Sequence, residues 1–227
     1  MKVINLFGAP SCGKSTTMLG LTYQMKMLGL NVENTPEFFK EMIYEDGRTE
    51  RFGGQLYILG EQNRRLARLQ EKSEFVVTDC PLPLIGYYTS NDYISGFHNF
   101  CNNLNASYDN TNYLIVRKHE FENEKRKHDE NEALLIAEQL PQYLEHFGIK
   151  YKVMESSEDL VDRILVDLVD ENVITKQHLL KSRNPTVRSK AMIPQLLKKH
   201  MKLFKIAQDV KQCIFSEKPI DAKFELS

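Results

Sequence analysis

Tryptophan is absent from this chain of 227 residues, and its four cysteines are widely separated, with no C-x-x-C pair. That spacing argues against a zinc site or a disulfide framework, and it favours a reducing, cytoplasmic setting. No stretch approaches the roughly 18 apolar residues of a membrane span, so we expect no membrane partner. Met1-Lys2 runs directly into an apolar segment, without the pattern of a secretory signal.

The charge of the chain is unevenly distributed. Residues 174–212 hold ten of the 30 Lys and Arg residues but only one of the 31 acidic residues, Asp209. This segment therefore carries a net charge of +9, whereas the rest of the chain carries −10. Such a split indicates that the C-terminal segment either packs on the acidic body or binds an external polyanion such as nucleic acid.

The most informative feature lies near the N-terminus. Residues 8–15 read G-x-x-x-x-G-K-S, the phosphate-binding loop, between an apolar run typical of a strand and a helical pattern. In this motif backbone N–H groups and the dipole of the new helix attract phosphate. The expected nucleotide-binding residues are Gly8, Ala9, Pro10, Ser11, Cys12, Gly13, Lys14, Ser15 and Thr16. Lys14 should reach the β- and γ-phosphates of ATP, and the hydroxyl of Ser15 should bind Mg²⁺.

The rest of the chain alternates between strand and helix patterns. Strands are expected over 2–7, 31–35, 74–78, 112–116 and 149–154, with helices over 14–28, 37–44, 55–72, 130–147 and 159–169. This alternation predicts an α/β fold with a parallel sheet that helices cover on both faces. In such sheets ligands bind beyond the carboxyl ends of the strands, so the residues after each strand are candidates for function.

Two carboxylates occupy such positions. Asp79 follows the apolar strand that ends at Thr78 and could hold Mg²⁺, although an aspartate before Pro81 is also typical of a turn. Glu37 follows the second strand and could orient or deprotonate an attacking hydroxyl, although an acidic residue also suits the first turn of a helix. We predict catalytic roles for both.

Cationic residues provide a second set of candidates. Arg64, Arg65 and Arg68 lie on the long helix and could bind an acceptor or its phosphate, although solvated arginines are common on helices. Residues 117–129 are highly charged and nearly devoid of apolar side chains, which favours a lid that closes over the nucleotide. Arg117 and Arg126 are its best candidates for contact with phosphate. The alternative is a simple solvated loop, because acidic residues in the same segment balance its positive charge.

Aromatic side chains gather between the third and fourth predicted strands. They could wall an acceptor pocket and stack on a base, but an ordinary hydrophobic core explains them equally well. The residues concerned are Tyr87, Tyr88, Tyr93, Phe97 and Phe100.

Together these features resemble the small P-loop kinases, in particular the thymidylate kinase, deoxynucleoside kinase and nicotinamide riboside kinase group and its phage-encoded ATP-binding members. The resemblance covers residues 1–170. It implies a five-stranded parallel sheet in the order 2-3-1-4-5, ATP and Mg²⁺ as donor and cofactor, and an acceptor opposite the phosphate-binding loop. By that likeness Glu37 is the acceptor-side carboxylate and Arg126 the lid arginine. Relatives often carry Gly-Arg in the lid, whereas this chain has Glu124-Lys125-Arg126-Lys127.

Three functions remain open. The first is transfer of the γ-phosphate of ATP to a nucleoside, a nucleotide or a related small acceptor. The second is a kinase that acts on nucleic acid, either on a hydroxymethylated base or at a 5′ end, with the basic segment contacting phosphates. The third is a P-loop NTPase that transfers phosphate to water. We expect a kinase domain over 1–173 and a basic, mainly helical extension over 174–227. As in related kinases, a homodimer is possible, and a phage-encoded protein would work in its host's cytoplasm.

Overall fold

The computed structural model describes residues 1–45, 54–117, 130–175 and 177–178. Its centre is a five-stranded sheet that consists of β1 (Lys2–Phe7), β2 (Val32–Thr35), β3 (Phe75–Thr78), β4 (Asp109–Val116) and β5 (Lys152–Glu155). The strand order is β2-β3-β1-β4-β5, and every neighbouring pair is parallel. Both the α/β class and the order 2-3-1-4-5 are therefore confirmed.

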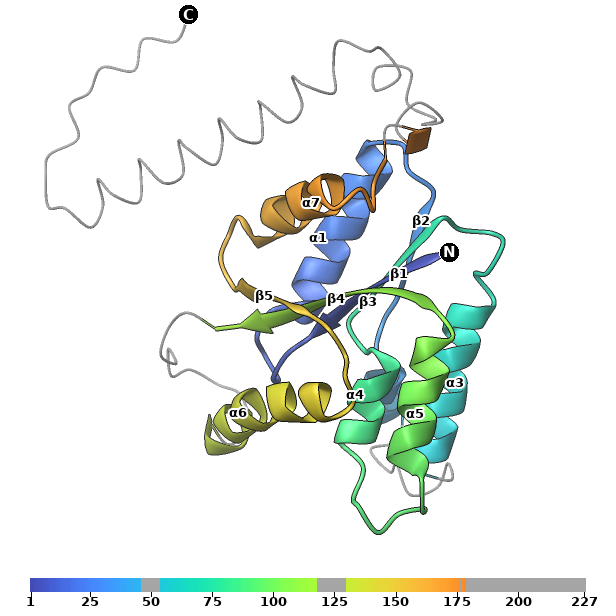
Figure 1. Cartoon of the computed structure of the whole chain (residues 1–227), viewed down its shortest axis with the longest axis vertical. Coiled ribbons are helices and arrows are strands. Elements are labelled where there is room, and N and C mark those ends of the chain that lie inside the picture. The colour runs from blue at the N-terminus through green and yellow to red at the C-terminus, as the bar shows by residue number, and fades with distance from the viewer. Residues whose placement is uncertain (46–53, 118–129, 176, 179–227) are drawn as a thin grey trace, which may run out of the picture.

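Helices cover both faces of the sheet (Figure 1). One face carries α1 (Lys14–Met27) and α7 (Leu160–Asp170). The other carries α3 (Gln55–Ala67), α4 (Leu82–Tyr87), α5 (Phe97–Ala106) and α6 (Glu130–His146), while the short α2 (Phe38–Glu45) follows β2 and contacts α3. No helix in the described part of the chain combines the length and the apolar character of a membrane span.

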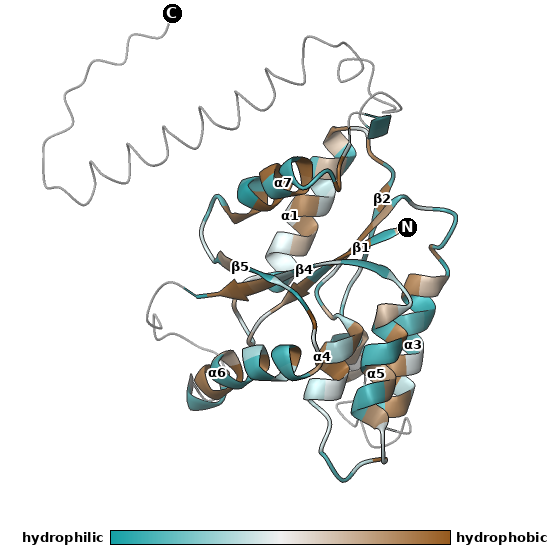
Figure 2. Cartoon of the chain, viewed as in Figure 1, coloured by the Kyte–Doolittle hydropathy of each residue, from teal (hydrophilic) through white to brown (hydrophobic). Residues whose placement is uncertain are grey.

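The sheet separates the hydrophobic core into layers. On one side, apolar residues of β1, β3 and β4 pack against α1 and α7, with Leu21 and Ile164 fully buried. On the other side, a second cluster joins the sheet to α3, α4 and α5, and a third joins it to α6. Figure 2 shows teal and brown residues alternating around α3, α5 and α7, as amphipathic helices require. Burial on both faces explains why the inner strand β3 reads as an almost continuous apolar run.

Three element boundaries differ from the prediction by three residues or more, and several others by one. The helix expected over 55–72 ends at Ala67, β4 begins at Asp109 rather than at residue 112, and β5 begins at Lys152 rather than at residue 149. After α3 the chain continues in turns, and Glu71 adopts a positive φ of 62°, which a helix does not allow.

The packing of the domain continues past Val173, the predicted boundary. Ile174 is buried in the core on the side of α1 and α7, and the His178 ring meets the Phe75 ring edge-on at 5.0 Å. The predicted helical extension beyond residue 178, most of the predicted lid (118–129) and Arg126 lie outside the described residues.

Candidate functional site

The phosphate-binding loop connects β1 to α1, as its sequence predicts. Gly13 caps α1 with a φ of 94°, and the N–H of Thr17 donates to its carbonyl oxygen at 2.9 Å. A Cβ atom at Gly8 would lie 2.6 Å from the carbonyl oxygen of Ile115, so only glycine fits there. The first N–H groups of α1 have no partner inside the helix, and together with the helix dipole they are suited to bind an anion.

Lys14 closes this loop on itself. Its Nζ donates to the carbonyl oxygens of Gly8 at 2.8 Å and Ala9 at 2.9 Å. Among the described residues, the ammonium group is held by these two main-chain carbonyls and by no ion pair, so it can turn towards a phosphate. Lys14 therefore lies where the motif requires it.

Arg117, at the end of β4, contacts the same loop from the neighbouring strand. Its Nη2 and Nε donate to the carbonyl oxygen of Ser11 at 2.6 and 3.2 Å. Ser11 adopts a positive φ of 61°, so this guanidinium supports a turn of the loop that is unfavourable for a serine. Of the predicted lid residues, Arg117 alone falls in the described part of the chain.

Cys12 lies on the inner side of the loop. It is 3% exposed, and burial raises the pKa of its thiol despite the positive charges of Lys14 and Arg117. The thiol therefore stays protonated at neutral pH, which favours a packing role over a redox role.

A pocket opens between this loop, the end of β4 and α6. Its wall is mostly apolar, with Arg117 as its charged member. The lining residues are Gly8, Ala9, Pro10, Cys12, Leu114, Ile115, Val116, Arg117, Ala133, Leu134, Ala137 and Leu140.

Asp79 connects the loop to the residues after β2. The hydroxyl of Ser15 donates to Asp79 Oδ2 at 2.5 Å, and the N–H of Glu37 donates to Asp79 Oδ1 at 3.0 Å. The Asp79 side chain lies at the end of β3, next to both β1 and β2, because β3 pairs with both strands. The sheet order thus brings together three residues that are distant in the sequence.

The Asp79 carboxylate and the Ser15 hydroxyl suit Mg²⁺, which prefers oxygen ligands and usually keeps several waters. No group of three or more His, Cys, Asp or Glu residues is placed to hold a metal ion among the described residues. A magnesium ion here would therefore take its remaining ligands from a bound triphosphate and from water.

Glu37 lies beside this pair. Burial, and then the negative charge of Asp79, raises the pKa of the Glu37 carboxyl, whereas Lys14 and Lys40 oppose the shift. A glutamate with a raised pKa, next to a phosphate site, has the properties of a general base.

The main chain around Glu37 is held by Gln62 of α3, a completely buried residue. Its Oε1 accepts from the N–H of Phe38 at 3.1 Å, and its Nε2 donates to the carbonyl oxygen of Pro36 at 3.3 Å. Sequence reasoning gave Gln62 no role. The available signal was a polar residue on the apolar face of a helix, between Leu59 and Leu66.

The three arginines of the long helix have different surroundings. Arg65 forms an ion pair with Glu41 of α2 and another with Glu61, and its guanidinium lies 4.8 Å from the centre of the Phe38 ring. Arg64 pairs with Glu61 and is largely exposed. Hydrogen bonds from Arg64 and then Arg65 lower the pKa of Glu61 to about 2.

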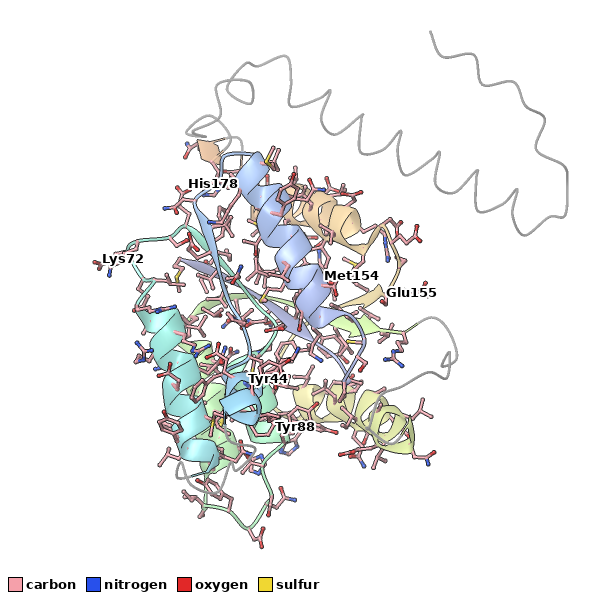
Figure 3. All side chains as sticks on the ribbon, turned by 180° about the vertical axis from the view of Figure 1, so that it is seen from behind. Tyr44, Lys72, Tyr88, Met154, Glu155 and His178 are labelled. Atoms are coloured by element: carbon pink, nitrogen blue, oxygen red, sulfur yellow. The ribbon has the colours of Figure 1, made fainter. Side chains whose placement is uncertain are left out.

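Arg68 lies at the opposite end of the helix from the phosphate-binding loop. It follows α3, from where the chain returns to the start of β3. Lys72, on that connection, lies on the side of His178 and away from Tyr88 (Figure 3). Of the three predicted acceptor arginines, Arg65 is the one placed next to the Glu37–Phe38 turn, and the roles of all three stay predictions.

The aromatic cluster divides between core and site. Tyr93 and Phe97 pack into the second hydrophobic cluster, and Tyr87 packs against the third. Tyr88 is 44% exposed, and partial burial and the charge of Glu37 raise the pKa of its phenol. Of the five predicted aromatic residues, Tyr88 is the one whose phenol experiences the charge of Glu37.

Comparison with known proteins agrees with the fold. Thymidylate kinase from Ehrlichia chaffeensis is 14% identical, with a TM-score of 0.52, over 74% of this chain and 97% of that one. Two further matches are shikimate kinase from Aquifex aeolicus and deoxyadenosine kinase from M. mycoides. The first is 17% identical, with a TM-score of 0.40, over 77% of this chain and 100% of that one. The second is 19% identical, with a TM-score of 0.46, over 77% of this chain and 100% of that one.

No curated protein matches the chain. A family model described as an AAA domain matches residues 3–163, which include the phosphate-binding loop, Glu37, Asp79 and Arg117. The chain belongs to this AAA domain family.

Proposed function

We propose that the protein transfers the γ-phosphate of ATP to a nucleoside, a nucleotide or a related small acceptor. The observation that carries the proposal is the bridge through Asp79, which bonds Ser15 of the phosphate-binding loop and the main chain of Glu37. A site that only bound nucleotide would not need a second carboxylate with a raised pKa next to the loop.

Each residue has a definite task in this reaction. The loop amides and Lys14 bind the triphosphate, and Lys14 stabilises negative charge on the migrating group. Ser15 and Asp79 would hold Mg²⁺, which would neutralise phosphate charge. Glu37 accepts the proton of the attacking hydroxyl or fixes that hydroxyl in line with the γ-phosphate. Tyr88 supports a planar part of the acceptor.

A transfer assay tests the proposal. ATP labelled in the γ-phosphate is offered with nucleosides, nucleotides, nicotinamide riboside or DNA, and the labelled product is identified. We expect label in one class of small acceptor, and loss of transfer in the Glu37→Gln variant with unchanged ATP binding. Release of inorganic phosphate alone, at the same rate in both proteins, would instead favour an NTPase that transfers to water.

Nucleic acid is the second candidate acceptor, because residues 174–212 carry a net charge of +9. A kinase that uses these cations for phosphate contacts should lose affinity for DNA steeply as salt rises. Removal of residues 179–227 should then abolish DNA binding but leave ATP binding intact. If that shortened chain still phosphorylates a small acceptor at the full rate, the nucleic-acid alternative is excluded.

A further inference from the structure

Gln62 is an unusual residue for its location. It lies in the middle of α3 with no solvent exposure, and its helical neighbours Ile58, Leu59 and Leu66 face the same hydrophobic cluster. A buried amide is costly unless its donor and acceptor groups are both satisfied. A leucine at this position would complete the apolar face of the helix, so the polar side chain calls for an explanation.

Its two hydrogen bonds reach the main chain on either side of Glu37. The Phe38 N–H donates to Gln62 Oε1 at 3.1 Å, and Gln62 Nε2 donates to the Pro36 carbonyl oxygen at 3.3 Å. The N–H of Glu37 itself donates to Asp79 at 3.0 Å. Two side chains from different elements thus hold three consecutive residues at the carboxyl end of β2.

The surrounding contacts extend this support. The Thr78 hydroxyl donates to the Thr35 carbonyl oxygen at 2.8 Å and accepts from the Cys80 N–H at 3.2 Å, so the turn after β3 is bonded to the end of β2. Arg65, one helical turn from Gln62, lies over the Phe38 ring. The main chain of Glu37 is therefore fixed from the end of β3 and from α3.

We propose that Gln62 is a positioning residue that fixes the main chain around Glu37 and so aims the Glu37 carboxylate at the acceptor. This inference rests on the proposed function, because it supports the acceptor side of the same reaction. A general base must lie within hydrogen-bond reach of the proton that it removes, and a displacement of 1 Å can lower a rate by about 10²-fold. A single residue that holds both flanking peptide groups provides this precision.

Two substitutions separate positioning from simple packing. Gln62→Met preserves the length and approximate volume of the side chain but removes both hydrogen bonds. Gln62→Glu can still accept from the Phe38 N–H, but as a carboxylate it cannot donate to the Pro36 carbonyl oxygen. Gln70→Met, at an exposed residue after α3, is the matched control.

The first readout is amide hydrogen exchange, which needs no acceptor. In Gln62→Met the exchange of the Phe38 amide should rise at least tenfold, whereas that of Glu37, which Asp79 still holds, should rise less. The Thr17 amide in the first turn of α1, which donates to Gly13 of the phosphate-binding loop, should not change. In Gln62→Glu the Phe38 amide should stay protected. Unchanged exchange at Phe38 in a folded Gln62→Met protein would overturn the proposal.

The second readout is the separation of kcat from ATP affinity. We expect kcat in Gln62→Met to fall on the order of 10²-fold, with the Kd for ATP within about twofold of that of the unmodified protein. The kcat of Gln62→Glu should lie between those of the unmodified protein and Gln62→Met. A parallel loss of ATP binding would mean that the substitution loosens the whole domain, and would contradict a positioning role. If the unmodified protein transfers phosphate to no acceptor, the proposed function fails, while the exchange experiment still decides whether Gln62 holds the turn.

Discussion

On the donor side of the site, one contiguous stretch of eight residues supplies the phosphate-binding loop, and most of its binding groups are main-chain amides. On the proposed acceptor side, Glu37, Gln62 and Tyr88 come from three segments that the fold brings together, and Asp79 links them to the loop. The donor side therefore depends on local backbone geometry, whereas the acceptor side depends on tertiary contacts between side chains. Substitutions should affect the two sides differently.

The largest effect is expected on the donor side, from Lys14→Ala. Loss of the ammonium group removes the charge that stabilises the migrating phosphoryl group, so transfer should fall on the order of 10³-fold for every acceptor. The fold should be kept, because the hydrogen bonds of Lys14 to Gly8 and Ala9 stay within the loop and hold no other element of the fold in place. Steady-state transfer rates and circular dichroism measure both quantities. Lys26→Ala, which removes an exposed pair with Glu33, is the control and should leave the rate unchanged.

The next effect belongs to the acceptor side. Glu37→Gln should lower kcat by about 10²-fold or more, with ATP affinity unchanged, because it removes the proton acceptor but not the phosphate site. The acid limb of the pH–rate profile of the unmodified enzyme should lie above 4.5, the ordinary pKa of a glutamate, because burial and Asp79 raise the pKa of Glu37. A profile that is flat down to pH 4.5 would contradict the role of Glu37 as a base.

The same substitution should stabilise the protein. A raised pKa in the folded state means that the neutral carboxyl is favoured by folding, and that this advantage is lost as the pH rises through the raised pKa. Glutamine resembles the neutral carboxyl at every pH. Thermal unfolding without nucleotide or Mg²⁺ should therefore show a higher Tm for Glu37→Gln at pH 8, and the difference should shrink towards pH 4.5. A lower Tm at pH 8 would show that the carboxylate is stabilised where it lies.

The contrast between local and tertiary construction also explains what the sequence could predict. The phosphate-binding loop and the continuous apolar strands are visible because each is encoded by neighbouring residues. The start of β4 was missed because its first residues are polar: the Asn5 amide donates to Asn110 and Asn112 across the sheet, each at 2.8 Å, and polar residues obscure the strand pattern. Such pairing depends on which strand lies alongside, which a single strand does not reveal.

Two features of α3 teach the same lesson. Leu69 continues the apolar spacing of the helix and packs against the second hydrophobic cluster, but it lies in the turn after Arg68. The prediction from apolar spacing therefore placed the end of the helix five residues beyond its observed end at Ala67. Gln62 interrupts the apolar face, yet its partners are main-chain atoms of the segment 36–38, which side-chain identity cannot indicate. Positions on a helix were predictable, whereas partners across the fold were not.

Arg65 and Arg64 provide a sharper comparison within the acceptor side. Arg65 is 13% exposed and joins α2 to α3 through Glu41, so Arg65→Met should lower the free energy of unfolding by about 1–2 kcal/mol. Arg64 is 62% exposed and pairs with Glu61 of its own helix, so Arg64→Met should leave stability nearly unchanged. Urea unfolding of both variants measures the difference. Equal stabilities, with a raised KM for the acceptor in Arg65→Met alone, would instead assign Arg65 to substrate binding.

The smallest effect is expected from Arg117→Gln, which returns to the donor side. Arg117 is an exposed residue whose guanidinium donates to the Ser11 carbonyl oxygen, so its loss removes a support of the loop but no main-chain amide of the phosphate site. A hydrogen bond of this kind contributes about 1 kcal/mol, which corresponds to a roughly fivefold rise in the Kd for ATP. Calorimetric titration with ATP measures this change, and the KM for the acceptor should stay constant. A rise in the acceptor KM with unchanged ATP affinity would place Arg117 on the acceptor side and remove the separation between the two sides.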